Sequence, residues 1–197
     1  MPRWIEPITL QGTHVRIEPL APEHRADLDA VAADGGLHRL WYTSVPTPEA
    51  MGAWIAAALT QRESAGAMPF VIRRAQDGKV VGATRYFNVA AEHRRLEIGH
   101  TFYAASVQRT AVNTESKLLL LTHAFDVLHC LGVELRTHFM NQASRRAIER
   151  LGARLDGVLR SHQVMPDGSL RDTCVYSILD REWPAVRNNL AFKLARR

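Results

Sequence analysis

Hydrophobic and polar residues alternate along seven stretches of the chain, and each stretch is predicted to form a strand. These stretches cover residues 8–20, 68–74, 79–89, 94–104, 133–140, 155–165 and 170–179. Tight-turn signals separate two neighbouring pairs, Gln-Asp-Gly at 76–78 and Pro-Asp-Gly-Ser at 166–169. The pattern therefore predicts two hairpins, and residues 94–104 extend the first of them into a meander.

Apolar residues recur at helical spacing in the segments between these strands. The predicted helices cover residues 21–34, 47–64, about 114–130, 141–153 and 180–197. Thr47 is a suitable N-cap for the second helix, and Gly152 is placed to close the fourth. Pro184 is expected to interrupt the last helix near its start.

The elements follow the order β-α-α-β-β-β-α-β-α-β-β, with a closing helix. This order predicts a mixed α+β fold, in which helices pack on a mixed sheet of six to seven strands. No repeat, linker or low-complexity segment divides the chain, so we expect one domain over residues 1–197. Its core would span about 9–179 and its C-terminal helix about 180–195. Ligands tend to bind where parallel strands end, which here follows residues 94–104.

Composition places the chain among ordinary globular proteins, since 46% of its 197 residues are apolar and 23% are charged. The longest aliphatic run, Leu118–Leu121, is too short for a membrane span, and the start lacks the pattern of a signal peptide. Cys130 and Cys174 form neither a CxxC pair nor a disulfide framework, which suits a reducing cytoplasm. We expect a cytoplasmic protein without a membrane partner.

The formal net charge of +5 is compatible with an anionic ligand or a nucleic acid. Lysine and arginine are nevertheless spread along the chain, and the one local cluster is the terminal "KLARR". We interpret the charge as a solvated basic surface and expect no nucleic-acid partner. A basic nucleic-acid-binding protein is an alternative that the net charge alone supports.

The segment "QRTAVNTE", Gln108–Glu115, is a short polar connection between a predicted strand and a predicted long helix. The first N–H groups of a helix have no intrahelical partner, so with the helix dipole they can bind an anion without glycine. Arg109 could add a charge-assisted contact to phosphate. The alternative is a plain connector with Asn113 or Thr114 as N-cap, since no Gly-x-Gly pattern is present.

Two long segments and the order of elements resemble the GNAT acyltransferase superfamily, in particular the branch of the ribosomal-protein N-terminal (alanine) acetyltransferases. The segments are "LEIGHTFYAASVQRTAVNTESKLLLLTHAF" and "NQASRRAIERLGARLDGVLRSHQVMPDGSLRDTCVYSIL", and the resemblance covers about Thr9 to Leu179. It implies that the strand at Leu96–Tyr103 splays from its parallel neighbour at Val133–Met140. The pantetheine arm of acetyl-coenzyme A (acetyl-CoA) would lie in the gap, and its pyrophosphate on the loop after the first strand.

The usual loop pattern in that family is Gln/Arg-x-x-Gly-x-Gly/Ala, which this chain follows in part. Gln108 matches the first position. Ala111 and Asn113 replace the two small residues, and Arg109 stands where glycine is often found. Ala111 can serve if its backbone is right-handed helical. Lys117 could help to hold phosphate, or could be an exposed lysine without a role. The expected cofactor-binding residues are Phe102, Tyr103, Gln108, Arg109, Thr110, Ala111, Val112, Asn113, Thr114, Asn141 and Ser144.

The resemblance implies a direct transfer, in which an amine attacks the thioester within a ternary complex. In the family, an Asn at the Asn141 position contacts the pantetheine arm. A Ser at the Ser144 position is thought to protonate the departing thiolate. The same two residues also suit the N-cap and first turn of a helix, an arrangement that is compatible with both roles.

The attacking amine must be neutral, so a general base or a water chain is required. Glu97 is a candidate base, directly or through water, and a salt-bridged or solvent-facing carboxylate is the alternative. His138 is a further candidate, whereas His100 is interpreted as a core histidine. A glutamate proposed as base in the ribosomal-protein branch aligns near Gln163, which cannot act as a base. Alternation predicts two faces of this strand, Glu97, Thr101 and Tyr103 on one and Leu96, Ile98, His100 and Phe102 on the other.

The acceptor pocket of this fold is built by the N-terminal helices and the late hairpin, whose aromatic candidates are Trp41, Tyr42, Trp54, Phe87 and His162. These could equally be core residues, so the acceptor is a small-molecule amine, an amino acid derivative or a protein N-terminus. We expect an acetyl-CoA-dependent N-acetyltransferase without a metal. The resemblance also implies that the protein could form a homodimer. The alternative is a CoA-binding protein of this fold that does not catalyse and acts as a sensor or structural partner.

Overall fold

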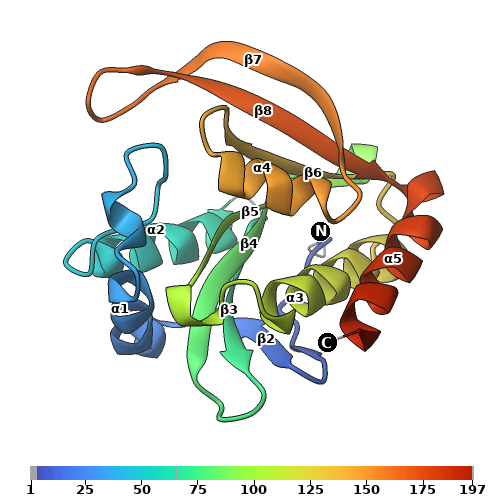
Figure 1. Ribbon diagram of the computed structural model, residues 1–197, viewed down its shortest axis with the longest axis horizontal. Helices are drawn as coiled ribbons and strands as arrows, with labels where there is room; N and C mark the ends of the chain where they lie inside the picture. Colours follow the sequence, from blue (N-terminus) through green and yellow to red (C-terminus); the bar gives the residue numbers. More distant parts are fainter. Residues whose placement is uncertain (1–3, 65, 197) are drawn as a thin grey trace.

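Eight strands form one mixed sheet in the computed structural model, which describes residues 4–64 and 66–196 (Figure 1). The strands are β1 (Leu10–Gln11), β2 (Val15–Pro19), β3 (Met68–Arg74), β4 (Val80–Ala90), β5 (Arg95–Tyr103), β6 (Gly132–His138), β7 (Arg154–Val164) and β8 (Leu170–Leu179). The helices are α1 (Arg25–Ala33), α2 (Met51–Ser64), α3 (Ala111–Thr122), α4 (Gln142–Glu149) and α5 (Trp183–Ala195). The strand order is β1-β2-β3-β4-β5-β6-β8-β7, with β5 and β6 parallel. The predicted mixed fold is confirmed.

The stretch predicted as a first strand, residues 8–20, is divided into two strands. Gly12–His14 form a turn in which the Gly12 N–H donates to the Val15 carbonyl at 2.8 Å, so β1 and β2 pair as a hairpin. The sheet therefore has eight strands in the described part of the chain, where the pattern predicted six to seven.

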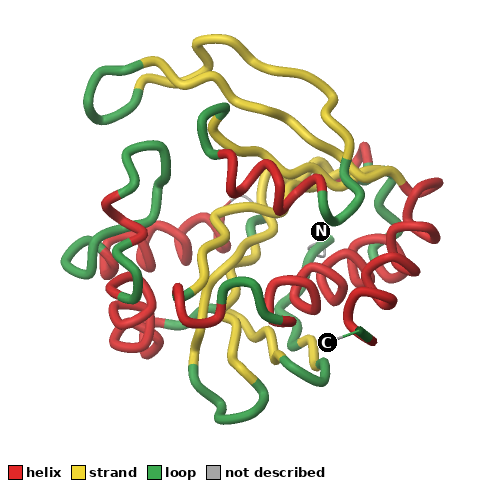
Figure 2. The backbone as a smooth tube through the Cα atoms, viewed as in Figure 1, coloured by secondary structure: helices red, strands yellow, loops and turns green. Residues whose placement is uncertain are grey.

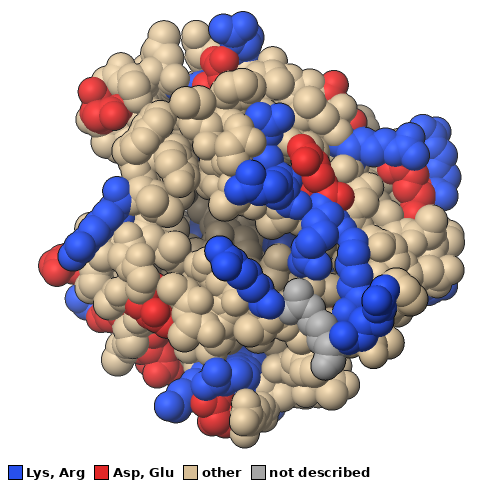
Figure 3. Space-filling view, in the orientation of Figure 1, with Lys and Arg blue, Asp and Glu red and all other residues tan. Residues whose placement is uncertain are grey.

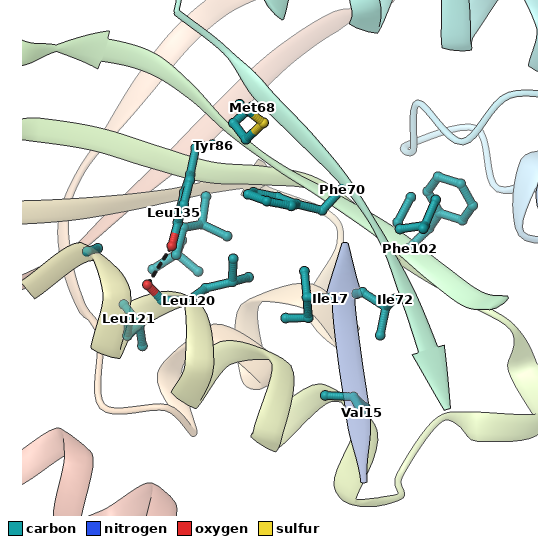
Figure 4. Packing of buried hydrophobic residues seen from close by; sticks show 14 of the residues in the cluster. Val15, Ile17, Met68, Phe70, Ile72, Tyr86, Phe102, Leu120, Leu121 and Leu135 are labelled. Atoms are coloured by element: carbon teal, nitrogen blue, oxygen red, sulfur yellow. Dashed lines mark hydrogen bonds between the residues drawn. The ribbon is translucent and has the colours of Figure 1, made fainter. Parts of the chain in front are cut away.

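The sheet separates two layers of helices, with α1 and α2 on one face and α3 and α5 on the other (Figures 1 and 2). Beneath α3, buried side chains of the strands meet Leu120 and Leu121, as Figure 4 shows. The hydroxyl of Tyr86 lies in this layer and donates to the Leu120 carbonyl at 2.6 Å, so its burial leaves no lost hydrogen bond. This packing fixes α3 relative to β4.

Helix ends agree with the sequence signals in part. Gly152 has a φ of 111° just after α4, as predicted for a closing glycine. Pro184 does not interrupt α5 but lies in its first turn, where a missing N–H is harmless. α3 begins earlier than predicted and continues into a π-helical turn, His123–Val127. None of the described helices is both long and apolar enough to cross a membrane.

β5 and β6 are paired over only part of their lengths. Their register contains three pairs, Arg95 with Gly132, Leu96 with Val133 and Glu97 with Glu134. Beyond these pairs β5 continues along β4, and β6 continues along β8. The predicted splay is therefore present, and the main chain of β5 that faces the gap has no strand partner there.

The side-chain alternation of β5 changes at His100. Gly99 and Phe102 are three positions apart, yet they oppose Arg85 and Ala83, which are two positions apart. His100 has a φ of 49° and is the extra residue of a β-bulge. The predicted faces are therefore wrong beyond Gly99. One face carries Glu97, Gly99 and Phe102, and the other carries Ile98, Thr101 and Tyr103.

Candidate active site

α3 begins after a short 3₁₀ turn, Ala105–Val107, that follows β5. Its N-cap is Thr110, whose hydroxyl donates to the Val107 carbonyl at 2.6 Å and accepts from the Val112 N–H at 3.3 Å. The predicted caps Asn113 and Thr114 are wrong, because both lie inside the helix. The remaining N–H groups of the first turn have no intrahelical partner, which makes this end suitable for an anion.

The backbone of the loop shows at which position glycine would be favoured. Arg109 has a φ of 62°, in the left-handed region where glycine is favoured and where other residues carry a cost of about 1–2 kcal/mol. Ala111 is the first residue of α3 and has no positive φ, so its predicted right-handed helical conformation is confirmed. The glycine requirement therefore falls on residue 109 and not on residue 111.

The end of α1 holds the loop in place. The Asp34 carbonyl accepts from the Ala105 N–H at 3.3 Å, and its carboxylate accepts from the Ser106 N–H at 3.2 Å and hydroxyl at 2.6 Å. Gly35 has a φ of 82°, and a Cβ there would lie 2.4 Å from the Cβ of Ala105. The close approach of these two segments thus depends on glycine.

Two polar side chains anchor α3 from inside the protein. The Glu115 carboxylate accepts from the successive main-chain N–H groups of residues 13–15 at 2.9, 2.6 and 2.7 Å. The Thr114 hydroxyl is buried and accepts from Arg150 at 3.0 Å. Both side chains are therefore engaged in positioning the helix.

Lys117 is not the exposed lysine predicted from the sequence, since it is only 5% exposed. Its amino group donates to the Thr101 hydroxyl at 3.0 Å, which also bonds to the Thr84 hydroxyl at 2.8 Å. Burial lowers the pKa of Lys117 to about 7, because the charged form is poorly solvated. The amino group thus reaches β5, and does not point to the loop.

Asn141 caps α4, as predicted, because its side-chain oxygen accepts from the Ser144 N–H at 3.0 Å. The Ser144 hydroxyl makes no hydrogen bond with the residues that the structure describes. Both side chains line one pocket with residues of β5 and β6. The capped start of α4 therefore places Asn141 and Ser144 at the pocket.

That pocket has a volume of about 130 Å³ and lies where β5 and β6 separate. It is lined by Tyr42, Thr43, Ser44, Val45, Trp54, His100, Thr101, Phe102, Arg136, Thr137, His138, Asn141, Ser144 and Arg171. The lining contains two guanidinium and two imidazole groups but no carboxylate. On the face seen in Figure 1, lysine and arginine side chains border a hollow between α4 and the start of α3 (Figure 3).

Glu97 lies behind the pocket wall. It is 4% exposed, accepts from the Asn88 amide at 2.9 Å, and lies 3.3 Å from Nε of Arg136. Arg136 also contacts Glu134 at 2.8 Å, so one guanidinium serves two carboxylates. Burial raises the pKa of Glu97 above its ordinary value, and the contacts with Asn88 and Arg136 oppose that rise. Its geometry is that of a salt-bridged strand carboxylate, the alternative left open by the sequence.

His138 lines the pocket, and its ring packs edge-on against Trp41 with 5.2 Å between centroids. Its Nδ1 accepts from the Met140 N–H at 3.0 Å, so Nε2 carries the proton of the neutral ring. Nε2 is buried and has no hydrogen-bond partner among the described residues. Burial lowers the pKa of His138, Arg171 lowers it further, and Asp172 opposes the change. The neutral ring therefore has no free lone pair with which His138 could act as a base, and its Nε2–H is an unused donor.

His100 is not a core histidine, contrary to the prediction, because the bulge turns it to line the pocket. Its ring packs edge-on against Phe87, with 4.9 Å between centroids. Desolvation, followed by the charges of Arg85 and Arg171, lowers the pKa of His100 to about 4. His100 is therefore neutral at pH 7.

The structure brings together some of the predicted site residues and not others. Ser144 and His138 line the same pocket, whereas Glu97 lies behind Arg136. The aromatic candidates divide into Tyr42 and Trp54, which line the pocket, and Trp41, Phe87 and His162, which do not.

Two lining arginines, Arg136 and Arg171, were not predicted. Arg136 has a sequence signal, because Glu134, Arg136 and His138 alternate along one strand and share a face. Arg171 has none, since only the folding of β8 against β6 brings it to the pocket.

Comparisons with known proteins agree with this architecture. A family model described as an acetyltransferase (GNAT) domain matches residues 14–154. The crystal structure of a GCN5-related N-acetyltransferase from Brucella melitensis is 31% identical, with a TM-score of 0.86 over 98% of this chain and 87% of that chain. The chain belongs to the GNAT acetyltransferase family.

Two further relatives extend the comparison. YdaF of Bacillus subtilis (strain 168), named as a suggested ribosomal N-acetyltransferase, is 30% identical over 107 residues, 54% of this chain and 57% of YdaF. The match thus spans less than two thirds of that curated relative. Mycobacterium smegmatis RimJ, solved in complex with CoA-disulfide, is 21% identical, with a TM-score of 0.79 over 95% of both chains. RimJ shares the fold.

Proposed function

We propose that the protein is an acetyl-CoA-dependent N-acetyltransferase that transfers an acetyl group to a primary amine by direct attack in a ternary complex. The observation that carries this proposal is the end of β5–β6 pairing after three residue pairs, beside the capped start of α3. The gap offers unpaired strand main chain to an extended arm, and the helix start offers N–H groups to a pyrophosphate. RimJ, which shares the fold, was solved with CoA-disulfide, and this supports CoA as a ligand of the fold.

The residues at the gap suit this cofactor. Acetyl-CoA would supply the acetyl group as a thioester. Ser144 would donate a proton to the departing sulfur, since its hydroxyl has no other partner in the described structure. His138 would donate its Nε2–H to a substrate oxygen. The amine proton would leave through water to the solvent, because the carboxylate of Glu97 is held by Arg136 and does not line the pocket.

The acceptor remains a small amine, an amino acid derivative or a protein N-terminus, and the kinship with YdaF supports the last of these. A cytoplasmic location and a homodimer stay predictions.

The test is release of the free CoA thiol from acetyl-CoA in the presence of a panel of primary amines and peptides, with mass spectrometry of the products. We expect thiol release that depends on the amine, with a mass increase of one acetyl group. Thermal stabilisation by CoA without turnover of any amine would instead support the non-catalytic alternative. A salt-dependent affinity for nucleic acid without any effect of CoA would contradict both.

A further inference from the structure

The pocket beyond the gap is positively charged, and only some of its arginines form ion pairs with carboxylates. Arg136 is held by Glu97 and Glu134, and Glu134 also binds Arg95 at 3.1 Å. These two carboxylates are therefore already shared between two guanidinium groups. A further positive charge at the pocket therefore has no carboxylate in direct contact, and Glu97 acts on Arg171 only at longer range.

Arg171 is such a charge. It lines the pocket from β8, and its Nε donates to the Thr173 hydroxyl at 3.0 Å. No carboxylate of the described residues lies within 4.0 Å of its guanidinium group, and its Nη atoms have no hydrogen-bond partner there. A half-buried guanidinium without a carboxylate in direct contact is costly, and a bound anion would reduce that cost. Arg171 is thus placed to form a bidentate pair with a carboxylate.

Arg85 adds a second uncompensated charge close by. It is 2% exposed, lies with its Cζ 5.1 Å from the centre of the Trp54 ring, and donates to the neutral amide of Gln61 at 2.6 Å. Its Nε is buried without a hydrogen-bond partner among the described residues. Trp54 lines the pocket, so Arg85 lies directly behind its wall, and the charges of Arg85 and Arg171 both lower the pKa of His100. The charge around the pocket is therefore predominantly positive.

A simple alkylammonium ion would be repelled by this pocket, so an amine must bring negative charge of its own in order to bind. We infer that the acceptor is an amine that carries a carboxylate close to its amino group, with Arg171 as the residue that binds the carboxylate. Arg171 contributes one guanidinium without an ion-pair partner, and a carboxylate supplies the one negative charge that would balance it. This inference rests on the proposed acetyl transfer and names its substrate class.

The same charges would assist the reaction. A positive environment favours the neutral form of a bound amine, which is the form that attacks a thioester. His138 would add its Nε2–H to the same carboxylate or to the substrate carbonyl oxygen. The carboxylate could belong to a free amino acid or to an acidic side chain at a peptide N-terminus, since both place it near an amino group.

The test measures kcat/KM for matched acceptor pairs that differ in one charge. The first arm compares free L-amino acids with their C-terminal amides, and the second compares peptide amides that begin with Asp or with Asn. In at least one of the two arms, we expect kcat/KM to be about 30-fold higher for the acceptor that carries the carboxylate than for its uncharged counterpart. A difference of this size is typical of a charge-assisted hydrogen-bonded pair. Arg171→Gln should reduce this preference to about threefold or less through KM, without changing affinity for CoA.

The matched control is Arg181→Gln, which removes the same charge from an exposed residue before α5. This variant should prefer the acceptor with the carboxylate as strongly as the unmodified protein does. Arg171→Lys retains the charge but not the planar fork, and should retain part of the preference.

The inference is overturned if the unmodified protein uses both members of every pair equally, or if Arg171→Gln keeps the preference. Absence of turnover with every amine would contradict the proposed function instead. In that case calorimetric binding of N-acetyl amino acids with CoA present decides the inference. Binding that Arg171→Gln abolishes supports it, and binding that is equal in both proteins, or absent from both, overturns it.

Discussion

The two sides of the β5–β6 gap are built in different ways. On the side of α3, the candidate pyrophosphate site consists mainly of main-chain N–H groups at a helix start capped by Thr110. On the side of α2, the pocket consists of side chains from the 42–45 loop, α2, β5, β6, α4 and β8. The first side depends on backbone geometry and accepts changes of side chain, whereas the second depends on which side chains are present.

This difference has a chemical meaning for a transferase. A main-chain site suits a cofactor that is the same for every member of a family, and it survives the loss of the usual glycine at residue 111. A side-chain pocket can be changed one residue at a time, and Arg171 is where we place its specificity. The variants below test whether the two sides behave as differently as they are built.

We expect the largest effect at Glu115, whose carboxylate anchors α3 from inside the protein. Glu115→Ala would leave the main-chain N–H groups of residues 13–15 without their acceptor; that of Val15 is buried and the other two are partly exposed. A buried unsatisfied donor costs about 1–3 kcal/mol and a partly exposed one less, so we expect the free energy of unfolding to fall by about 4 kcal/mol in chemical denaturation. Glu92→Ala, at a side chain that is 73% exposed, is the control and should change it by less than about 0.5 kcal/mol. Equal stability of the two variants would show that this anchor does not hold α3.

Lys117 gives the next largest effect, and it depends on pH. Between about pH 7 and pH 10.5 the unfolded chain keeps a proton that folded Lys117 has lost, so stability rises with pH there. Below about pH 7 Lys117 is protonated in both the folded and the unfolded states, so the full cost of burying its charge destabilises the folded protein. The shift of the Lys117 pKa from 10.5 to about 7 corresponds to roughly 5 kcal/mol at about 1.4 kcal/mol per unit. Loss of the hydrogen bond to Thr101 offsets about 1–2 kcal/mol of this, so Lys117→Met should be more stable at pH 7 by roughly 3 kcal/mol. The gain should shrink towards pH 10, and a gain that is independent of pH would refute the assignment.

Ser144→Ala tests the acceptor end of the gap. We expect kcat to fall about 100-fold through loss of a proton donor, while the Kd for CoA changes by less than about twofold. Ser144→Thr keeps a hydroxyl group and should restore part of the rate. Unchanged turnover in Ser144→Ala would remove this residue as the acid.

The smallest effect is expected at Arg109, whose φ of 62° suits glycine. Arg109→Gly should keep affinity for CoA within about threefold, because the backbone is retained. Arg109→Val should weaken binding about tenfold, since a β-branched residue is strained at this angle. Calorimetric titration with CoA compares the two. Equal affinities would mean that the loop backbone does not bind the pyrophosphate.

The sequence could predict the element order, the splay and the position of the loop, because these follow from strand and helix patterns and from the family resemblance. It could not choose among Thr110, Asn113 and Thr114 as the cap of α3, since all three are suitable residue types. The bulge at His100 was not predictable from alternation, because it is defined only by the pairing of β5 with β4. That single inserted position exchanged the faces of the last residues of β5.

The pocket was the part least accessible from sequence. Its lining comes from six segments, and no local pattern shows that Arg171 and Trp54 line one pocket or that Arg85 packs on Trp54. Lys117 was predicted to be exposed, because an isolated lysine in a helix usually is. Its burial is set by the packing of α3 against β5, which the helical pattern alone does not specify.

The crystal structure of the protein with CoA bound tests the central claim most directly. We predict that the pantetheine arm lies between β5 and β6, with its pyrophosphate oxygens about 3 Å from main-chain nitrogens between residues 109 and 113. The sulfur should lie beside Ser144. A pyrophosphate bound away from the start of α3, or an arm outside the gap, would contradict the proposed site.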